Sequence, residues 1–195
     1  DIVVEEVGPS RVRITYMITE GKKAKIGSIA FEGNDRLSDR KLKKGMETKR
    51  RWLFLGGKYD ESKFETDLTK VIDKYGDVGR MEAEITGTEM TYSPSGKSVD
   101  IKVTVVEGPE YTVATVEPGN NEVYDDDEIM DITKTKPGEV HNKSQVTTDA
   151  ETVRKGYESS GYINANVEPQ VTLNKEEKTT HVVQQVQEGD LKYVK

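Results

Sequence analysis

Stretches in which apolar and polar residues alternate occur three times along the chain, and each one ends in Glu-Gly. They cover residues 12–21, 99–108 and 182–189. Alternation with a period of two predicts a β-strand that buries one face. The Glu-Gly pairs follow one another at distances of 87 and then 81 residues, which indicates a repeated unit of domain size.

Between these strands the apolar residues follow the period of an α-helix. In the first copy they are Phe64, Leu68, Val71, Ile72 and Tyr75, and in the second copy Val146, Ala150, Val153 and Tyr157. The spacing of three or four residues places each set on one face of a helix. Asp60 precedes the first of these helices and is a suitable N-cap. Each copy is therefore predicted to contain a long amphipathic helix.

A longer motif joins the helix to the following strand in both copies. The motif Asp-x7-Tyr-x3-Gly begins at Asp67 and again, 82 residues later, at Asp149. This repetition predicts two full modules with a fragment on either side. The chain is accordingly divided into the closing hairpin of a preceding module (1–21), a first module (22–108), a second module (109–189) and the start of a following module (190–195).

The order of elements predicted for each module is β-α-α-β-β, an α+β fold. A short strand, 25–31 or 111–117, opens the module, and a Gly-Asn turn leads into a short helix. Ser38 is expected to cap the first short helix and the acidic run 125–128 to begin the second, because acidic residues suit the positive end of the helix dipole. We expect the two helices to cover one face of a three-stranded mixed sheet. The last strand then lies between the other two, which leaves the first and second strands as open edges.

The composition favours small modules over one large core. Only 33% of the residues are hydrophobic, 33% are charged, and there is no cysteine, which excludes disulfides, thiol catalysis and zinc–thiolate sites. No apolar run approaches the roughly 18 residues of a transmembrane helix. The net charge of −7 combines −2 in residues 1–21, +3 in residues 22–108 and −8 in residues 109–195. This acidity argues against nucleic acid as the main partner.

Residues that could carry chemistry are few. The two histidines, His141 and His181, stand in a turn and a strand without the spacing of a catalytic or metal site, and we expect both on the surface. The acidic run 125–128 lacks the alternation of a calcium loop. Gln184 takes a core-facing position where the first module has Val103, so the second core is expected to be thinner or locally solvated. We predict no catalytic residue, no metal site and no cofactor.

The two modules resemble the POTRA domain, the polypeptide-transport-associated module. The resemblance rests on Gly33-Asn34, the run from Asp67 to Ala83 and Glu107-Gly108 in the first module, and on Gly119-Asn120, the segment 136–139, the run from Asp149 to Ala165 and Glu188-Gly189 in the second. It covers nearly the whole chain. Within the family the modules are most similar to the third and fourth POTRA domains of BamA-like outer-membrane assembly factors. Arg80 stands where the family usually has tyrosine, a departure that leaves the fold intact.

This resemblance implies a function without catalysis. The chain would belong to the periplasmic part of an outer-membrane β-barrel assembly factor whose parent chain carries a C-terminal membrane β-barrel. Its partners would be unfolded outer-membrane proteins, accessory assembly lipoproteins and neighbouring POTRA modules. Two other interpretations stay open: the POTRA region of a two-partner secretion transporter, and an inert structural spacer. A carboxylate hydrolase would need carboxylates clustered in a cleft, and the sequence indicates no such cluster.

Two kinds of surface are candidate binding sites. An open sheet edge offers unpaired N–H and C=O groups, to which an extended peptide can add as another strand. The second strands, expected at 81–92 and 163–173, are the candidate edges. Their proposed binding residues are Met81, Glu82, Ala83, Glu84, Ile85, Thr86, Ile163, Asn164, Ala165, Asn166 and Val167. The other candidate is a loop made of Arg51, Trp52, Leu53, Phe54 and Leu55. Apolar residues in a loop either fold back onto their own core or meet a partner.

Overall fold

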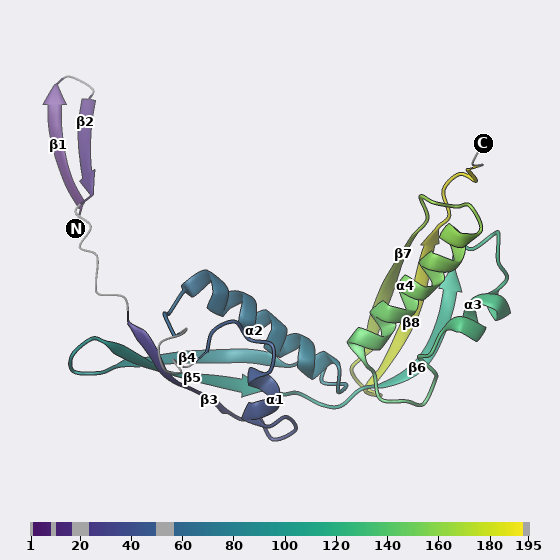
Figure 1. The fold of residues 1–195 in the computed structure, drawn as a ribbon, viewed down its shortest axis with the longest axis horizontal. Coiled ribbons are helices and arrows are strands. Elements are labelled where there is room, and N and C mark those ends of the chain that lie inside the picture. Colours follow the sequence, from purple (N-terminus) through teal and green to yellow (C-terminus); the bar gives the residue numbers. More distant parts are fainter. Residues whose placement is uncertain (1, 9–10, 17–23, 50–56, 193–195) are drawn as a thin grey trace.

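A computed structural model describes residues 2–8, 11–16, 24–49 and 57–192. The first two of these segments form an antiparallel hairpin of β1 (Ile2–Gly8) and β2 (Arg11–Tyr16) (Figure 1). The assignment of this hairpin to a preceding module stays a prediction. Within the described residues no helix is long and apolar enough to cross a membrane.

The first module has the predicted order β-α-α-β-β (Figure 1). Its elements are β3 (Lys25–Glu32), α1 (Asp39–Lys43), α2 (Glu61–Gly76), β4 (Glu84–Tyr92) and β5 (Ser98–Val106). The strands lie in the order β3-β5-β4, with β5 parallel to β3 and antiparallel to β4. The last strand therefore lies between the other two, and the prediction of a mixed sheet is confirmed.

The second module repeats this arrangement. Its elements are β6 (Thr112–Gly119), α3 (Asp126–Ile132), α4 (Lys143–Ser159), β7 (Asn166–Asn174) and β8 (Thr179–Gln187). The strand order is β6-β8-β7, again parallel and then antiparallel. In both modules the long helix lies over the sheet, as Figure 1 shows for α2 and α4.

Polar side chains cap three of the helices, α2, α3 and α4, and on α4 Asn142 accepts from the N–H of Gln145 at 2.9 Å. Asp60 accepts a hydrogen bond from the N–H of Lys63 at 3.2 Å, as predicted. Asp125 and Glu128 form a reciprocal capping box at the start of α3, which gives the acidic run a structural role. Ser38 stands at the N-cap of α1, but its side chain makes no capping hydrogen bond. Only its position was predicted correctly.

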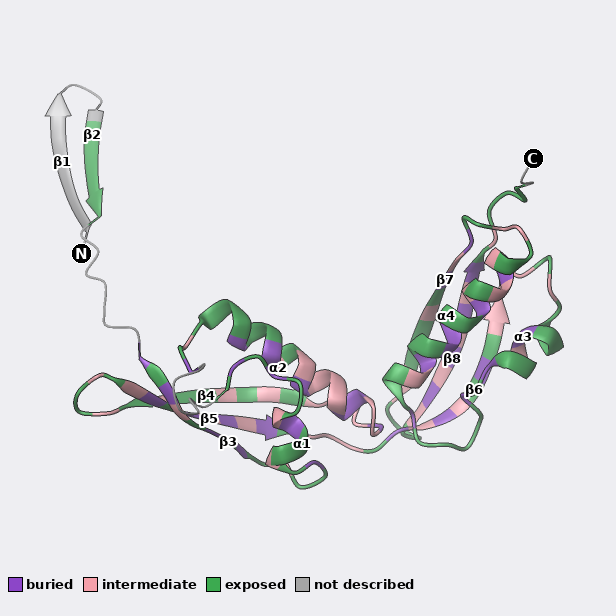
Figure 2. Ribbon diagram, viewed as in Figure 1, coloured by how far each residue is buried: buried purple, intermediate pink, exposed green. Residues whose placement is uncertain are grey.

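The central strands carry the cores of both modules. Figure 2 shows the buried residues concentrated on β5, β8 and the inner faces of the long helices. All four inward-facing residues of β5 are aliphatic, and these are Val99, Ile101, Val103 and Val105. On β8 the corresponding residues are Thr180, Val182, Gln184 and Val186. Thr180 and Gln184 are the two polar residues among these, and the buried hydrophobic residues of the second module form two separate clusters.

Gln184 confirms one expectation and corrects another. It faces the core, as predicted, but it is fully buried and the alternative of a locally solvated face is wrong. Its amide nitrogen donates to the carbonyl of Val146 at 3.3 Å, and its amide oxygen has no partner. The protein's own groups thus satisfy only half of this buried side chain.

The repeated aspartate of the sequence motif ties the segment after each short helix to the long helix. Asp67 is fully buried and accepts hydrogen bonds from the N–H groups of Glu47 and Thr48 at 2.8 and 2.7 Å. Asp149 does the same for the N–H groups of Lys134 and Thr135 at 3.0 and 2.8 Å. Burial acts to raise the pKa of Asp67, but these hydrogen bonds outweigh it and hold the pKa below its usual value.

Candidate functional site

The first strands of the two modules are partly covered edges. At the start of β3, Ile26 donates to the carbonyl of Gly57 at 2.6 Å, and an isolated bridge joins Lys25 to Lys58. At the start of β6, Val113 donates to the carbonyl of Glu139 at 2.8 Å. The segments between the helices thus occupy part of these edges, which leaves β4 and β7 as the more open ones.

The candidate edge residues fall into two groups. Glu84, Ile85, Thr86, Asn166 and Val167 lie in the strands β4 and β7. The residues that precede them lie outside both strands, and these are Met81, Glu82, Ala83, Ile163, Asn164 and Ala165. The expected strand starts were wrong here, because the chain first makes a turn against the end of the long helix. In the first module Arg80 donates to the carbonyl of Tyr75 at 2.9 Å.

Beyond a register shift between Ile85 and Gly87, the edge of β4 presents a regular row of backbone groups. The hairpin closes with a hydrogen bond from the N–H of Ser93 to the carbonyl of Ser98 at 2.9 Å. Because paired and unpaired positions alternate in an antiparallel ladder, Thr88, Met90 and Tyr92 point their N–H and C=O groups away from β5. No other strand among the described residues pairs with this side of β4.

Charged residues near β4 are engaged on the face of the sheet. Lys102 on the central strand contacts Glu89 of β4 at 3.3 Å and Glu32 of β3 at 3.1 Å, so one cation joins carboxylates of the two outer strands. Exposed pairs of this kind add little stability. They do hold Glu89 on the sheet face, where its charge does not block the backbone groups of the edge.

The edge of β7 is interrupted by a proline. Pro169 pairs with Gln184 in the middle of a strand whose register continues without a shift. Since proline has no N–H, an unbroken register places its nitrogen toward the open edge. A strand that added to β7 would find no donor at this position. The two candidate edges therefore differ, and β4 is the better acceptor of a strand.

Two other sequence-based expectations have different outcomes. The candidate loop 51–55 lies outside the described residues. His141 was expected on the surface, and this is wrong: its side chain is fully buried, with Nδ1 3.0 Å from the hydroxyl of Thr180. His181 is half-buried in β8 and lies 3.0 Å from the hydroxyl of Thr115. The contact with Thr180 holds the His141 ring against β8 of its own module.

At the junction between the modules the end of α2 meets the start of α4. Lys143 contacts Asp73 at 2.7 Å, and the N–H of Ser144 donates to the carboxylate of Asp77 at 2.9 Å. Both carboxylates belong to the first module and lie at the N-terminal turn of a helix in the second. This placement is favourable because the N-terminus of a helix attracts negative charge. The long helices are thus joined by polar contacts.

Tyr111 forms the second connection across the junction. It is fully buried, its N–H donates to the carbonyl of Gly79 at 2.8 Å, and its hydroxyl donates to Glu82 at 2.7 Å. Lys175, from the turn after β7, pairs with the same carboxylate. The bonds from Lys175 and Tyr111 lower the pKa of Glu82, and the bond to Glu82 raises the pKa of Tyr111 to about 12. Sequence reasoning missed this set, because its members come from separate parts of the chain.

Lowering the pH is expected to destabilise the second module before its carboxylates titrate. Burial lowers the pKa of His141, and the charged side chains on the same cavity wall, Arg80 and Lys143, are both cationic. The unfolded chain therefore binds a proton near pH ~6.5 that the folded chain does not bind, and stability falls as the pH drops below that value. The slope approaches ~1.4 kcal/mol per pH unit, the limit for one proton.

Urea unfolding of the wild type and of His141→Gln, followed over this pH range, measures the effect. The variant is expected to lose the slope between neutral pH and the range where carboxylates begin to titrate. Equal slopes in the two proteins would show that another group is responsible.

Comparison with known proteins agrees with this architecture. The sequence pattern of the POTRA family, described as a surface antigen variable number repeat, matches residues 24–108 and 111–189. The chain belongs to the POTRA family. POTRA domains of BamA-like factors are non-catalytic, which makes the sheet edges and the junction, and not a catalytic centre, the features of functional interest.

One relative of this POTRA chain is an outer-membrane assembly factor. The outer membrane protein assembly factor BamA of Neisseria meningitidis is 32% identical over 197 residues, which cover 98% of this chain and 25% of that protein. The chain thus spans about a quarter of the length of that relative and is homologous to its periplasmic part.

Solved structures show the same fold. BamA POTRA3-5 of Haemophilus influenzae has a TM-score of 0.68 at 23% identity, over 90% of this chain and 71% of that one. BamA of Haemophilus ducreyi lacking POTRA domains 1-3 has a TM-score of 0.63 at 16% identity, over 84% of this chain and 29% of that one.

Proposed function

We propose that this chain is part of the periplasmic region of an outer-membrane β-barrel assembly factor and that its first module receives unfolded outer-membrane proteins by strand addition at β4. The observation that carries the proposal is the open edge of β4, where Thr88, Met90 and Tyr92 present unpaired backbone groups. Accessory assembly lipoproteins, neighbouring POTRA modules and a C-terminal membrane β-barrel are the further partners that the relationship to BamA supports.

Strand addition suits a client that has no fixed sequence. Backbone hydrogen bonds form with any extended segment, whatever its side chains are. Each such bond contributes about 1 kcal/mol net, and the ordering of the peptide opposes it. We therefore expect dissociation constants in the micromolar to millimolar range, which allow the client to be released. On β7 the missing donor at Pro169 makes the same reaction weaker.

Titration of isotope-labelled protein with a ten-residue peptide of alternating apolar and polar residues tests the proposal. Amide shifts are expected along Thr88, Met90 and Tyr92, with little change on β7. The substitution Met90→Pro removes an outward donor from the middle of the row and is expected to weaken binding at least tenfold. Met90→Leu keeps the donor and is the matched control.

The reciprocal substitution Pro169→Val supplies the donor that β7 lacks. In this variant the peptide is expected to shift amide signals on β7 as well as on β4. If millimolar peptide shifts neither strand in the wild type, the chain acts as an inert spacer and the proposal is wrong. If Met90→Leu weakens binding as much as Met90→Pro, side chains and not the backbone edge hold the peptide.

A further inference from the structure

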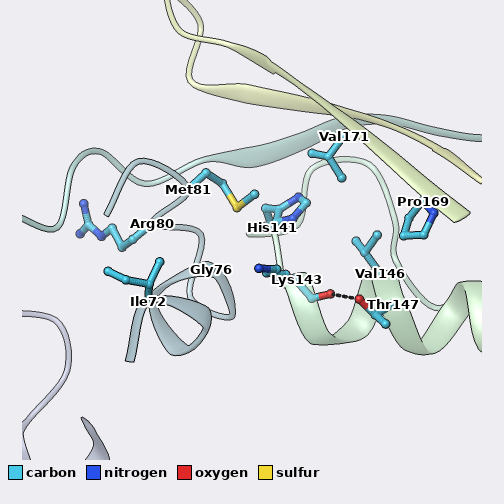
Figure 3. A pocket seen from close by; sticks show the side chains of 10 residues that line it. All are labelled: Ile72, Gly76, Arg80, Met81, His141, Lys143, Val146, Thr147, Pro169 and Val171. Atoms are coloured by element: carbon cyan, nitrogen blue, oxygen red, sulfur yellow. Dashed lines mark hydrogen bonds between the residues drawn. The ribbon is translucent and has the colours of Figure 1, made fainter. Parts of the chain in front are cut away.

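A cavity of about 240 Å³ lies at the junction between the two modules (Figure 3). Both modules contribute to its wall, and most of the lining is apolar: Ile72, Met81, Val146, Pro169 and Val171. An apolar cavity of about 150 Å³ in another protein is large enough to bind benzene. The junction cavity therefore has room for one aromatic side chain.

Two buried polar atoms of the lining residues have no partner, Nε2 of His141 and Nε of Arg80. The ring of His141 lines the cavity, and Figure 3 shows it between Met81 and Val171. Its Nδ1 is engaged by Thr180, whereas its Nε2 is buried and makes no hydrogen bond. A buried donor or acceptor without a partner costs free energy, which a ligand with a complementary group would recover.

The cavity lies where the proposed docking edge begins. Met81 precedes the first residue of β4, Glu84, by three positions, so it lies within about 10 Å of the start of that strand. Pro169 and Val171 belong to β7, the open edge strand of the second module. An extended segment that leaves β4 at its N-terminal end therefore arrives at the opening between the modules.

We propose that the junction cavity holds a tyrosine side chain of the extended segment that docks on β4, with the phenol hydroxyl bonded to Nε2 of His141. The inference rests on the proposed function, and it adds a side-chain pocket to a backbone edge. In strand-addition sites the backbone bonds supply affinity and such pockets supply specificity. The pocket is assembled from both modules and exists only while the junction is closed.

Tyrosine is the side chain whose chemistry fits this wall. The ring matches the apolar lining, and the hydroxyl can both donate and accept a hydrogen bond. This matters because the contact with Thr180 is compatible with either tautomer of His141, so Nε2 is a donor in one case and an acceptor in the other. Phenylalanine would leave Nε2 unpartnered, and the indole of tryptophan can only donate.

Two titrations test the inference. Two ten-residue peptides share one alternating sequence and carry either tyrosine or alanine at both ends, so that either orientation brings one end residue to the junction. The tyrosine peptide is expected to bind about tenfold more tightly and to shift the methyl signal of Met81. In parallel, p-cresol is expected to shift Met81 and the His141 imidazole more strongly than toluene does, because toluene lacks the hydroxyl.

A pair of substitutions on β7 separates the cavity from the rest of the surface. Val171→Trp fills the cavity and is expected to abolish the advantage of the tyrosine peptide while leaving the alanine peptide unaffected. Thr172→Trp places the same side chain on the opposite face of the strand and is expected to change neither peptide.

The outcomes distinguish this inference from the proposed function. Equal affinities of the two peptides, with shifts on β4, would overturn the tyrosine pocket and leave strand docking in place. If neither peptide shifts β4, strand docking fails and the pocket fails as part of it. The p-cresol titration then shows only whether the cavity recognises a phenol. If p-cresol binds no better than toluene, the cavity does not recognise a phenol either.

Discussion

Replacing Asp67 by alanine is expected to lower the free energy of unfolding of the first module by about 3–5 kcal/mol. The carboxylate is fully buried and accepts two backbone N–H groups, from Glu47 and Thr48, and a third hydrogen bond from Lys70 at 3.3 Å. Hydrogen bonds to a charged group contribute roughly 1.5–3 kcal/mol each, and alanine leaves both backbone donors without a partner. The loss is far above that of an ordinary surface substitution.

Urea unfolding, followed by amide signals of each module, measures this loss. Asp149→Ala provides the same test in the second module, where the carboxylate holds the N–H groups of Lys134 and Thr135. Glu65→Ala is the matched control, since it removes an exposed carboxylate from the same helix and is expected to change stability by less than about 0.5 kcal/mol. A loss below about 1 kcal/mol for Asp67→Ala would mean that the segment after α1 is held in some other way.

The repeated aspartate illustrates what the sequence can and cannot predict. Its recurrence at Asp67 and Asp149 marks the two modules, and the apolar period that follows each one predicts the long helices correctly. These patterns are local, so they can be read without knowing the partners. Each carboxylate accepts hydrogen bonds from two backbone N–H groups that lie 14 to 20 residues earlier in the chain. The side chains of these donor residues follow no recognisable pattern.

The starts of the edge strands were predicted wrongly for a related reason. The alternation of Met81, Ala83 and Ile85 continues without a break into β4, although the first two residues belong to a turn. The turn is set by hydrogen bonds to the end of α2, which a period-2 pattern does not reveal. Pro169 is the opposite case, because a proline inside a predicted strand is itself a signal that its nitrogen faces an open edge.

The junction could not be predicted, since it depends on contacts between modules. His141 has no neighbours in sequence that indicate burial, and its main-chain N–H donates to the carbonyl of Tyr111, 30 residues earlier, at 2.9 Å. Tyr111 in turn reaches Gly79 and Glu82 of the first module. The repeat predicts that two modules exist, whereas their mutual contacts arise from residues in which the copies differ.

Replacing Gly79 by alanine is expected to destabilise the chain by about 3 kcal/mol and to loosen the junction. Gly79 has a φ of +76°, and a Cβ there would lie 2.7 Å from Cγ1 of Val140 and 2.8 Å from the carbonyl oxygen of Tyr111. The left-handed backbone alone costs an alanine about 1–2 kcal/mol. The rest of the loss comes from displacing Val140 and Tyr111 of the second module. Tyr111 is also the residue whose N–H donates to the carbonyl of Gly79.

Gly96→Ala separates these two contributions. Gly96 has a φ of +65°, but a Cβ there would meet no atom within 4 Å, so this variant reports the backbone cost alone. Nitrogen-15 relaxation is expected to show the two modules tumbling together in the wild type and in Gly96→Ala, and more independently in Gly79→Ala. Because the junction cavity requires contact between the modules, Gly79→Ala should also lose the preference for p-cresol over toluene. Equal stabilities and equal tumbling in the two variants would show that the contact of Gly79 with Val140 and Tyr111 does not fix the modules.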